Sequence, residues 1–100
     1  MKLPNGYETK TTFWQDFSIA DVFGKSAVKD TFKRAFKEWK EDYIYMTELS
    51  IVLNLKIWQY WENKNEEMSK VYNELWLKIE NYIYDNFTEQ ELKYYHRVTD

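Results

Sequence analysis

The sequence predicts an all-α fold, a compact bundle of four to five helices with a central and largely buried third helix. Its 100 residues include only two Gly and one Pro, too few for the many turns of an all-β protein. Apolar residues recur at intervals of three and four in successive segments, which is the period of an amphipathic helix. Short connections of two to six residues join these segments, as in a helical bundle. We expect a single domain over residues 1–100.

The N-terminal part is expected to contain a lead-in followed by a first helix. Residues 1–10 are predicted to be extended or frayed, with the only Pro at the second position of a β-turn. The first helix is predicted over about 12–23, because Thr12 and Gln15 have the spacing of a capping box. Gly24 supplies the left-handed conformation that ends many helices.

A second helix is predicted over about 26–41, with Ser26 as its N-cap. Its apolar residues form one stripe at helical spacing: Val28, Phe32, Ala35, Phe36, Trp39 and Tyr43. The helix is expected to end near Lys40 or Glu41. Because no Gly or Pro follows, residues 42–46 are expected to form a short bend.

The third helix, predicted over about 47–62 with Thr47 as N-cap, differs from the others. From Leu49 to Trp61 it is apolar nearly all round, since the few polar residues do not share a face. A helix of this kind is buried on several sides. We therefore expect it to be the central helix, or a helix that also contributes to an oligomer interface.

Two further helices are predicted in the C-terminal third. The fourth, over about 66–86 and capped by Asn63 or Asn65, has the clearest apolar stripe: Met68, Val71, Tyr72, Leu75, Ile79, Tyr82 and Ile83. Thr88 and Glu91 form a second capping-box pattern, which opens a short fifth helix over about 89–96. The remaining residues are expected to be loose.

The residue inventory argues against an enzyme. Without Cys, a disulfide framework, a thiolate zinc site and cysteine catalysis are excluded. His96 is the sole histidine and has no ligand partner at helical spacing, and no phosphate-binding or nucleophile motif is present. We expect no catalytic residue, no cofactor and no metal. Because neither a signal peptide nor a long apolar run is found, we expect a cytoplasmic protein without membrane contact.

Charge is distributed unevenly along the chain. Between Lys25 and Lys40 six basic residues stand against two acids, whereas from Glu62 to Glu91 eight acids stand against three lysines. Four basic residues form a ridge beside the apolar stripe of the second helix: Lys29, Lys33, Lys37 and Lys40. This ridge is suited to phosphates or to an acidic protein, or it is an ordinary solvated flank. The acidic pI of 5.2 argues against nucleic-acid binding.

Twenty aromatic residues in this chain exceed what the helical stripes require. Nine are assigned to the core by their spacing: Phe13, Phe17, Phe32, Phe36, Trp39, Trp58, Trp61, Tyr72 and Tyr82. Most of the others lie off or at the edge of the stripes and are candidates for partner binding: Trp14, Tyr43 or Tyr45, Tyr60, Trp76, Tyr84, Tyr94 and Tyr95. Trp and Tyr dominate binding hot spots, so we expect a cluster of them at the surface. The alternative is that large rings simply fill a small core.

Several segments carry a resemblance to known proteins: Thr11–Phe17, Lys29–Phe32, Glu38–Lys40, Thr47–Leu49, Lys56–Trp58 and Tyr72–Trp76. Over about residues 11–100 the chain resembles small proteins carried on conjugative and phage-like elements of Gram-positive gut bacteria. The resemblance implies an accessory protein of a mobile genetic element. Such proteins often bind and block host defence proteins, as anti-CRISPR inhibitors do.

Three functions remain open on this basis. The first is a non-enzymatic protein that binds another protein through exposed aromatic residues and the helix-two ridge, in the most concrete case an inhibitor of a host defence system such as CRISPR-Cas. The second is a nucleic-acid-binding regulator that uses the same ridge, with Arg34. The third is a self-associating structural protein, a homodimer with third-helix rings at its interface.

Overall fold

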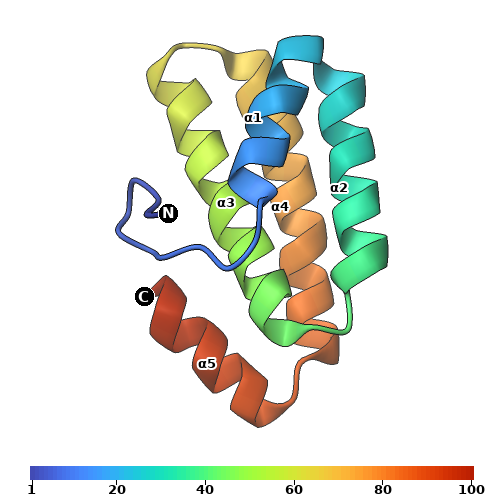
Figure 1. Ribbon diagram of the computed structural model, residues 1–100, viewed down its shortest axis with the longest axis vertical. Coiled ribbons are helices and arrows are strands. Elements are labelled where there is room, and N and C mark those ends of the chain that lie inside the picture. Colours follow the sequence, from blue (N-terminus) through green and yellow to red (C-terminus); the bar gives the residue numbers. More distant parts are fainter.

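The computed structural model describes residues 1–100 as five α-helices with short connections (Figure 1). The helices are α1 (Phe13–Phe23), α2 (Lys25–Trp39), α3 (Tyr43–Glu62), α4 (Glu66–Asn86) and α5 (Glu89–Thr99). Neighbouring helices from α1 to α4 run antiparallel along the long axis, whereas α5 crosses the lower end of the bundle. The all-α fold predicted from the sequence is therefore confirmed.

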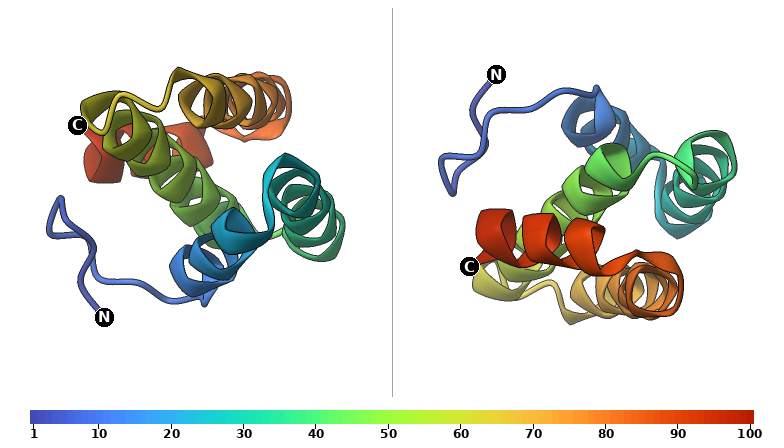
Figure 2. Two further views of the ribbon diagram at one scale, coloured as in Figure 1. Left: turned by 90° about the horizontal axis from the view of Figure 1, so that it is seen from above. Right: turned by 90° about the horizontal axis from the view of Figure 1, so that it is seen from below.

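Helix α3 is the centre of the bundle, as predicted. Seen along the bundle axis, it lies between the α1–α2 hairpin on one side and α4 with α5 on the other (Figure 2). All eight residues from Met46 to Leu53 are buried. Phe17 of α1, Val28 of α2 and Tyr72 of α4 are among the side chains that complete this core. The full circumference of α3 is covered at this level, which is why its sequence is apolar nearly all round.

Gly24 serves two helices at once. Its φ of +104° ends α1, as predicted, and its amide donates a hydrogen bond to Ala20 O at 3.1 Å. The same residue is the N-cap of α2, which begins at Lys25, so the prediction of Ser26 as N-cap was wrong. A single residue with positive φ reverses the chain direction, and no separate cap is needed. The predicted Thr12–Gln15 capping box is also absent, because the Thr12 hydroxyl donates to Asp16 Oδ2 at 3.0 Å.

Helix α3 starts four residues earlier than predicted. Asp42 is its N-cap and accepts a hydrogen bond from the Tyr45 amide at 3.1 Å. Of residues 42–46, expected to form a bend, Asp42 is the cap and residues 43–46 are helical. Thr47, predicted as the cap, lies inside the helix, and its hydroxyl donates to Tyr43 O at 2.8 Å. Thr satisfies its hydroxyl in this way when it lies within a helix, so its capping preference does not mark a start here.

The last two helices agree best with the sequence. Helix α4 has the predicted bounds, and Asn65 caps it by accepting from the Met68 amide at 3.1 Å. The Thr88–Glu91 capping box is formed at the start of α5. Helix α5 continues to Thr99 instead of ending at residue 96, and its Val98 packs against the core. The tail expected to be loose is therefore helical, because an apolar residue in its last turn has a surface to pack on.

The N-terminal segment is held in place by a buried carboxylate. The predicted turn is present, with the Gly6 amide donating to Leu3 O at 2.8 Å, and the Leu3 side chain is buried. Glu48 of α3, fully buried, accepts hydrogen bonds from the Lys10 amide at 2.7 Å and the Thr11 amide at 3.0 Å. Of the two alternatives expected for this segment, extended or frayed, the frayed one is wrong, since charge-assisted bonds fix its end to the central helix. The segment contains no helix.

Candidate protein-binding surface

Two tryptophans of α3 emerge from the core into solvent. Trp58 is 55% exposed and Trp61, one turn further, is 58% exposed. The sequence had assigned both to the core because they continue the apolar pattern of α3. That assignment was wrong: the neighbouring elements cover only part of the helix circumference along its last two turns. Contiguous exposed apolar patches, rather than single exposed rings, are typical of interaction sites.

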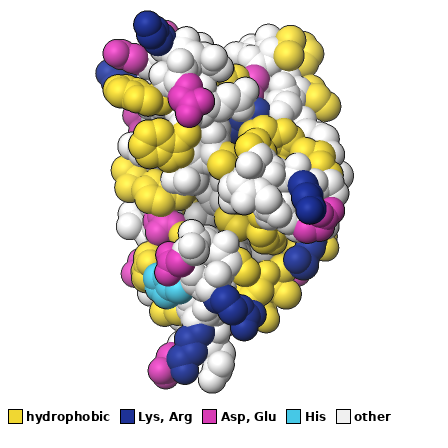
Figure 3. All heavy atoms as spheres, turned by 90° about the vertical axis from the view of Figure 1, so that its left-hand side faces the viewer, with side chains coloured by type: hydrophobic (Ala, Val, Ile, Leu, Met, Phe, Trp, Pro, Cys, Tyr) yellow, Lys and Arg dark blue, Asp and Glu magenta, His cyan; other side chains and the backbone are white.

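A cleft of about 320 Å³ includes Leu55 of α3, one helical turn before Trp58. Its walls come from four parts of the chain, namely the N-terminal segment, α3, α4 and α5. Ile51 and Leu55 of α3 line it, and Trp58 follows them at helical spacing on the same face. The cleft therefore ends one helical turn from Trp58, on the same face of α3. Figure 3 shows hydrophobic side chains gathered on this side of the molecule, above the single histidine.

Helix α4 contributes two of the predicted aromatic residues to this surface. Trp76 and Tyr84, two turns apart, both line the cleft. Tyr84 is 51% exposed, whereas Trp76 is half-buried and packs against the core. We call Trp58, Trp61, Trp76 and Tyr84 together the aromatic surface.

Glu80 lies next to the cleft, where it contacts two of the residues that line it, Ser50 and Tyr95. Its Oε1 atom accepts hydrogen bonds from Ser50 Oγ at 3.0 Å and from the hydroxyl of Tyr95. Burial raises the pKa of Glu80, while the Ser50 hydrogen bond and the charge of His96 act in the opposite direction. Tyr95 is only 5% exposed, so its prediction as an exposed partner-binding residue was wrong. Its ring packs inward from α5 and its hydroxyl is used within the molecule.

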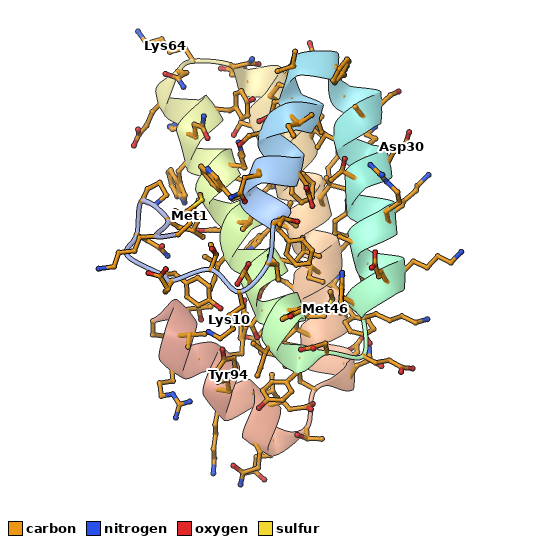
Figure 4. The ribbon with its side chains drawn as sticks, in the orientation of Figure 1. Met1, Lys10, Asp30, Met46, Lys64 and Tyr94 are labelled. Atoms are coloured by element: carbon orange, nitrogen blue, oxygen red, sulfur yellow. The ribbon has the colours of Figure 1, made fainter.

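The other predicted aromatic candidates are half-buried and packed against neighbouring rings. Tyr45 lies edge-on to Trp39 with ring centroids 4.7 Å apart, and Tyr60 stacks on Tyr72 at 5.8 Å. Tyr94 lies edge-on to Tyr43 at 5.3 Å, where α5 passes the N-terminal segment near Lys10 (Figure 4). Aromatic pairs of this kind stabilise the fold, which is the use that the alternative prediction gave them.

Trp14 belongs to a buried polar cluster that the sequence did not reveal. Lys56 of α3 is 2% exposed, and its Nζ atom lies 4.4 Å from the centroid of the Trp14 ring. The same ammonium group donates to Asp21 Oδ2 and to Ser18 Oγ, each at 2.9 Å. Asp21 also accepts a hydrogen bond from the Tyr72 hydroxyl. No local pattern announces the pair, because 35 residues separate its two charges.

The lysine ridge is exposed but lies on a different side. Lys29, Lys33 and Lys37 occupy successive turns of α2, and Lys40 follows its last residue. None of the four has a carboxylate within 4.0 Å. Helix α2 forms the right-hand edge of the bundle in Figure 1, whereas α3 and the N-terminal segment lie to the left. The structure therefore does not join the ridge and the aromatic surface into one interface.

Helix α1 presents a second apolar area that sequence reasoning missed. Ile19, Val22 and Phe23 are all exposed. A groove of about 690 Å³ between α1 and α2 is lined by Ile19 and Phe23 and also by charged side chains of both signs. The available signal was that apolar residues of α1 extend around more than one face of the helix.

Comparison with protein-family models, curated proteins and solved structures finds no significant match to this chain. None of the five helices combines the length and the apolar character that crossing a membrane requires. Glu62, Glu66, Glu67 and Glu74 are exposed. The arrangement offers rings, a carboxylate and a cleft at one surface, which are features of a recognition site.

Proposed function

We propose that this chain is a non-catalytic protein-binding module whose partner contacts the aromatic surface. The exposure of Trp58 and Trp61 is the observation that carries this proposal. Each ring offers a large contact area at low cost in conformational entropy, and Trp is the residue most enriched among binding hot spots. The adjoining cleft adds a concave feature into which a partner side chain fits.

The charge around the aromatic surface indicates the chemistry of the partner. Glu62 follows Trp61 directly, and Glu66 and Glu67 open α4 at the same end of the bundle. Of these three carboxylates only Glu67 has a salt-bridge partner, Lys25 at 2.8 Å. Complementarity therefore favours a partner that surrounds apolar side chains with basic ones. A second copy bound by two-fold symmetry would instead place this acidic patch against an identical one.

We propose that the partner is a host defence protein, on the basis of the resemblance to accessory proteins of mobile elements. RNA-guided nucleases hold nucleic acid in positively charged channels, which suits an acidic and aromatic surface. In this proposal the chain inhibits such a nuclease by occupying its channel.

The proposal is tested by affinity capture from a lysate of a Gram-positive host, with matched variants of the tagged protein. W58A/W61A removes the two exposed rings, and K33E/K37E alters the opposite side of the bundle. Lys33 and Lys37 are exposed, so K33E/K37E should change the free energy of unfolding by about 0.5 kcal/mol. W58A/W61A also removes the buried parts of two rings and should cost more. We expect a partner that the wild type and K33E/K37E retain and W58A/W61A loses. Equal capture by all three proteins contradicts the proposal.

The inhibitory role has its own measurement. Target-DNA cleavage by a CRISPR nuclease of the same host is followed after addition of the purified wild type, and separately after addition of the W58A/W61A variant as the control. We expect the wild type to lower the cleavage rate and the variant to leave it unchanged. If cleavage is unaffected, the inhibitory role is rejected. The binding role is then decided by the capture experiment alone.

A nucleic-acid-binding regulator is the second candidate, because the lysines of the ridge have no carboxylate partner. Gel shifts with single- and double-stranded DNA at several salt concentrations test it. Binding through the ridge predicts affinity that falls steeply with salt and is lost in K33E/K37E but retained in W58A/W61A. The opposite pattern, or no shift at low salt, rejects this candidate.

Self-association is the third candidate, and the exposed α3 tryptophans are the observation that favours it. Light scattering of the wild type distinguishes it from the other two. A dimer that becomes a monomer in W58A/W61A supports this role, and a monomer at high protein concentration rejects it.

A further inference from the structure

The carboxylate beside the cleft has no cationic partner. Only the Oε1 atom of Glu80 takes part in hydrogen bonds, and no Lys or Arg lies within 4.0 Å of the group. No Lys or Arg lines the cleft either, whereas Asp100 does. His96, exposed on the rim, is the one basic side chain among the lining residues. This end of the cleft therefore carries negative charge that the protein itself balances only weakly.

Aromatic rings surround the same end of the cleft. The ring of Tyr84 lies 6.2 Å from that of Tyr95 at an interplanar angle of 86°, and 5.8 Å from that of His96. Trp76 lines the cleft on the same helix as Tyr84. Ring faces attract a cation placed within about 6 Å of their centroids, and the attraction is larger where water is excluded. Rings next to a carboxylate are a known means of recognising a positive charge.

The volume of the cleft limits the size of the group that it can hold. A volume of about 320 Å³ is at the small end of the range for ligand pockets, about 300–1,000 Å³. This space suits one extended side chain and is too small for a helix. Trp58 lies beyond Leu55 on the same face of α3, so a residue next to the inserted side chain reaches it.

We propose that the cleft receives one lysine or arginine side chain of the partner protein, whose neighbouring apolar residue packs on Trp58. The inserted cation contacts the rings of Trp76 and Tyr84 and pairs with the carboxylate of Glu80. This inference rests on the proposed function and names the chemistry of the partner at its central contact. A neutral side chain would remove the carboxylate from water without replacing its hydration, and an anionic one would be repelled.

NMR titration of the full ¹⁵N-labelled chain tests the proposal with small probes. The probes are the N-acetyl methylamides of arginine and lysine, and the norleucine derivative is the matched neutral control. The five indole N–H groups serve as reporters, with the Trp76 signal assigned from a W76F variant. We expect saturable shifts of the Trp76 signal and of His96 with the basic probes, and none with norleucine.

Two variants locate the site, and a third serves as control. E80Q removes the charge, and we expect it to raise the dissociation constant of the basic probes about tenfold or more. Y84L alters an exposed ring and leaves the buried hydrogen bonds intact, so it tests the cleft even where E80Q perturbs folding. K33E/K37E, on the other side of the bundle, should bind as the wild type does.

The proposal is overturned by equal shifts with norleucine, by wild-type affinity in Y84L, or by the absence of saturable shifts with both basic probes. Its failure is distinguishable from failure of the proposed function. Tryptophan-dependent capture of a partner without binding of the basic probes removes the cleft assignment and leaves the binding module. Binding of the probes without tryptophan-dependent capture rejects the binding module and leaves the cleft assignment.

Discussion

Replacing Lys56 with Met tests how the buried ion pair contributes to stability. Lys56 is 2% exposed and its ammonium group lies 2.9 Å from Asp21 Oδ2. With an effective dielectric constant of about 20, two unit charges at this distance attract by roughly 6 kcal/mol. Removing both charges from water costs several kcal/mol per ion, so the net contribution of the intact pair is small.

The K56M variant removes the attraction but leaves the cost of burying Asp21. We therefore expect the free energy of unfolding to fall by about 3–5 kcal/mol, a large part of the total of about 5–15 kcal/mol for a domain. For a domain of this size, the melting temperature should fall by more than about 12 °C. Equilibrium unfolding in urea, followed by circular dichroism at the helix band, measures the change directly.

The double variant K56M/D21N is the matched control. Asn keeps the shape of Asp21 and an oxygen that accepts the Tyr72 hydrogen bond, but it carries no charge. We expect it to recover most of the stability lost in K56M, because no unpaired charge remains. The reasoning is refuted if K56M lies within 1 kcal/mol of the wild type (about the size of one ordinary hydrogen bond) or if the double variant is as unstable as the single one.

Three further predictions concern single positions. Gly24→Ala should destabilise by about 1–2 kcal/mol in urea unfolding, because its φ of +104° strains an L-residue although the added Cβ has open space; an unchanged midpoint would contradict the account of the α1–α2 turn. Thr88→Ala removes the capping box and should cost about 1 kcal/mol, with Thr88→Ser as the control that retains it. The raised pKa of Glu80 means that the native state holds its proton more firmly than the unfolded state does, so the stability of the wild type relative to E80Q should decline as pH rises above the ordinary carboxyl value of 4.5. Parallel stability–pH curves for the two proteins would show that the carboxyl group is not perturbed.

The sequence predicts best where a structure depends on nearby residues. The bounds of α4, its Asn65 cap and the capping box of α5 all rest on side chains within three or four residues of the groups they contact. Helix amphipathicity is equally local, and it was sufficient for the all-α class. The start of α3 was missed because Asp42 and Thr47 are both acceptable caps, and only the packing of the first turn decides between them.

The candidate surface was predicted in part for a different reason. An apolar pattern shows that a residue favours burial, but it does not show whether another element covers that position. Trp58 and Trp61 fit the apolar pattern of α3 and are exposed, whereas Tyr95 lies off the expected stripe and is buried. No local pattern indicates a functional role for Glu80, because its partners Ser50 and Tyr95 are 30 and 15 residues away in the chain. Such contacts become visible only once the helices are placed together.

Because Glu48 holds the N-terminal segment by a few hydrogen bonds, part of the cleft wall can open while the rest of the fold stays intact. The hydrogen bonds of Glu48 to the Lys10 and Thr11 amides join residues 38 and 37 positions apart, so the N-terminal segment docks only onto a formed α3. Asn5, which lines the cleft, is carried by that segment. Segments held by few bonds open at a lower free energy than the global transition. Hydrogen exchange at the Lys10 and Thr11 amides therefore reports the fraction of molecules in which the cleft has lost this wall, and ligand binding in the cleft should slow it.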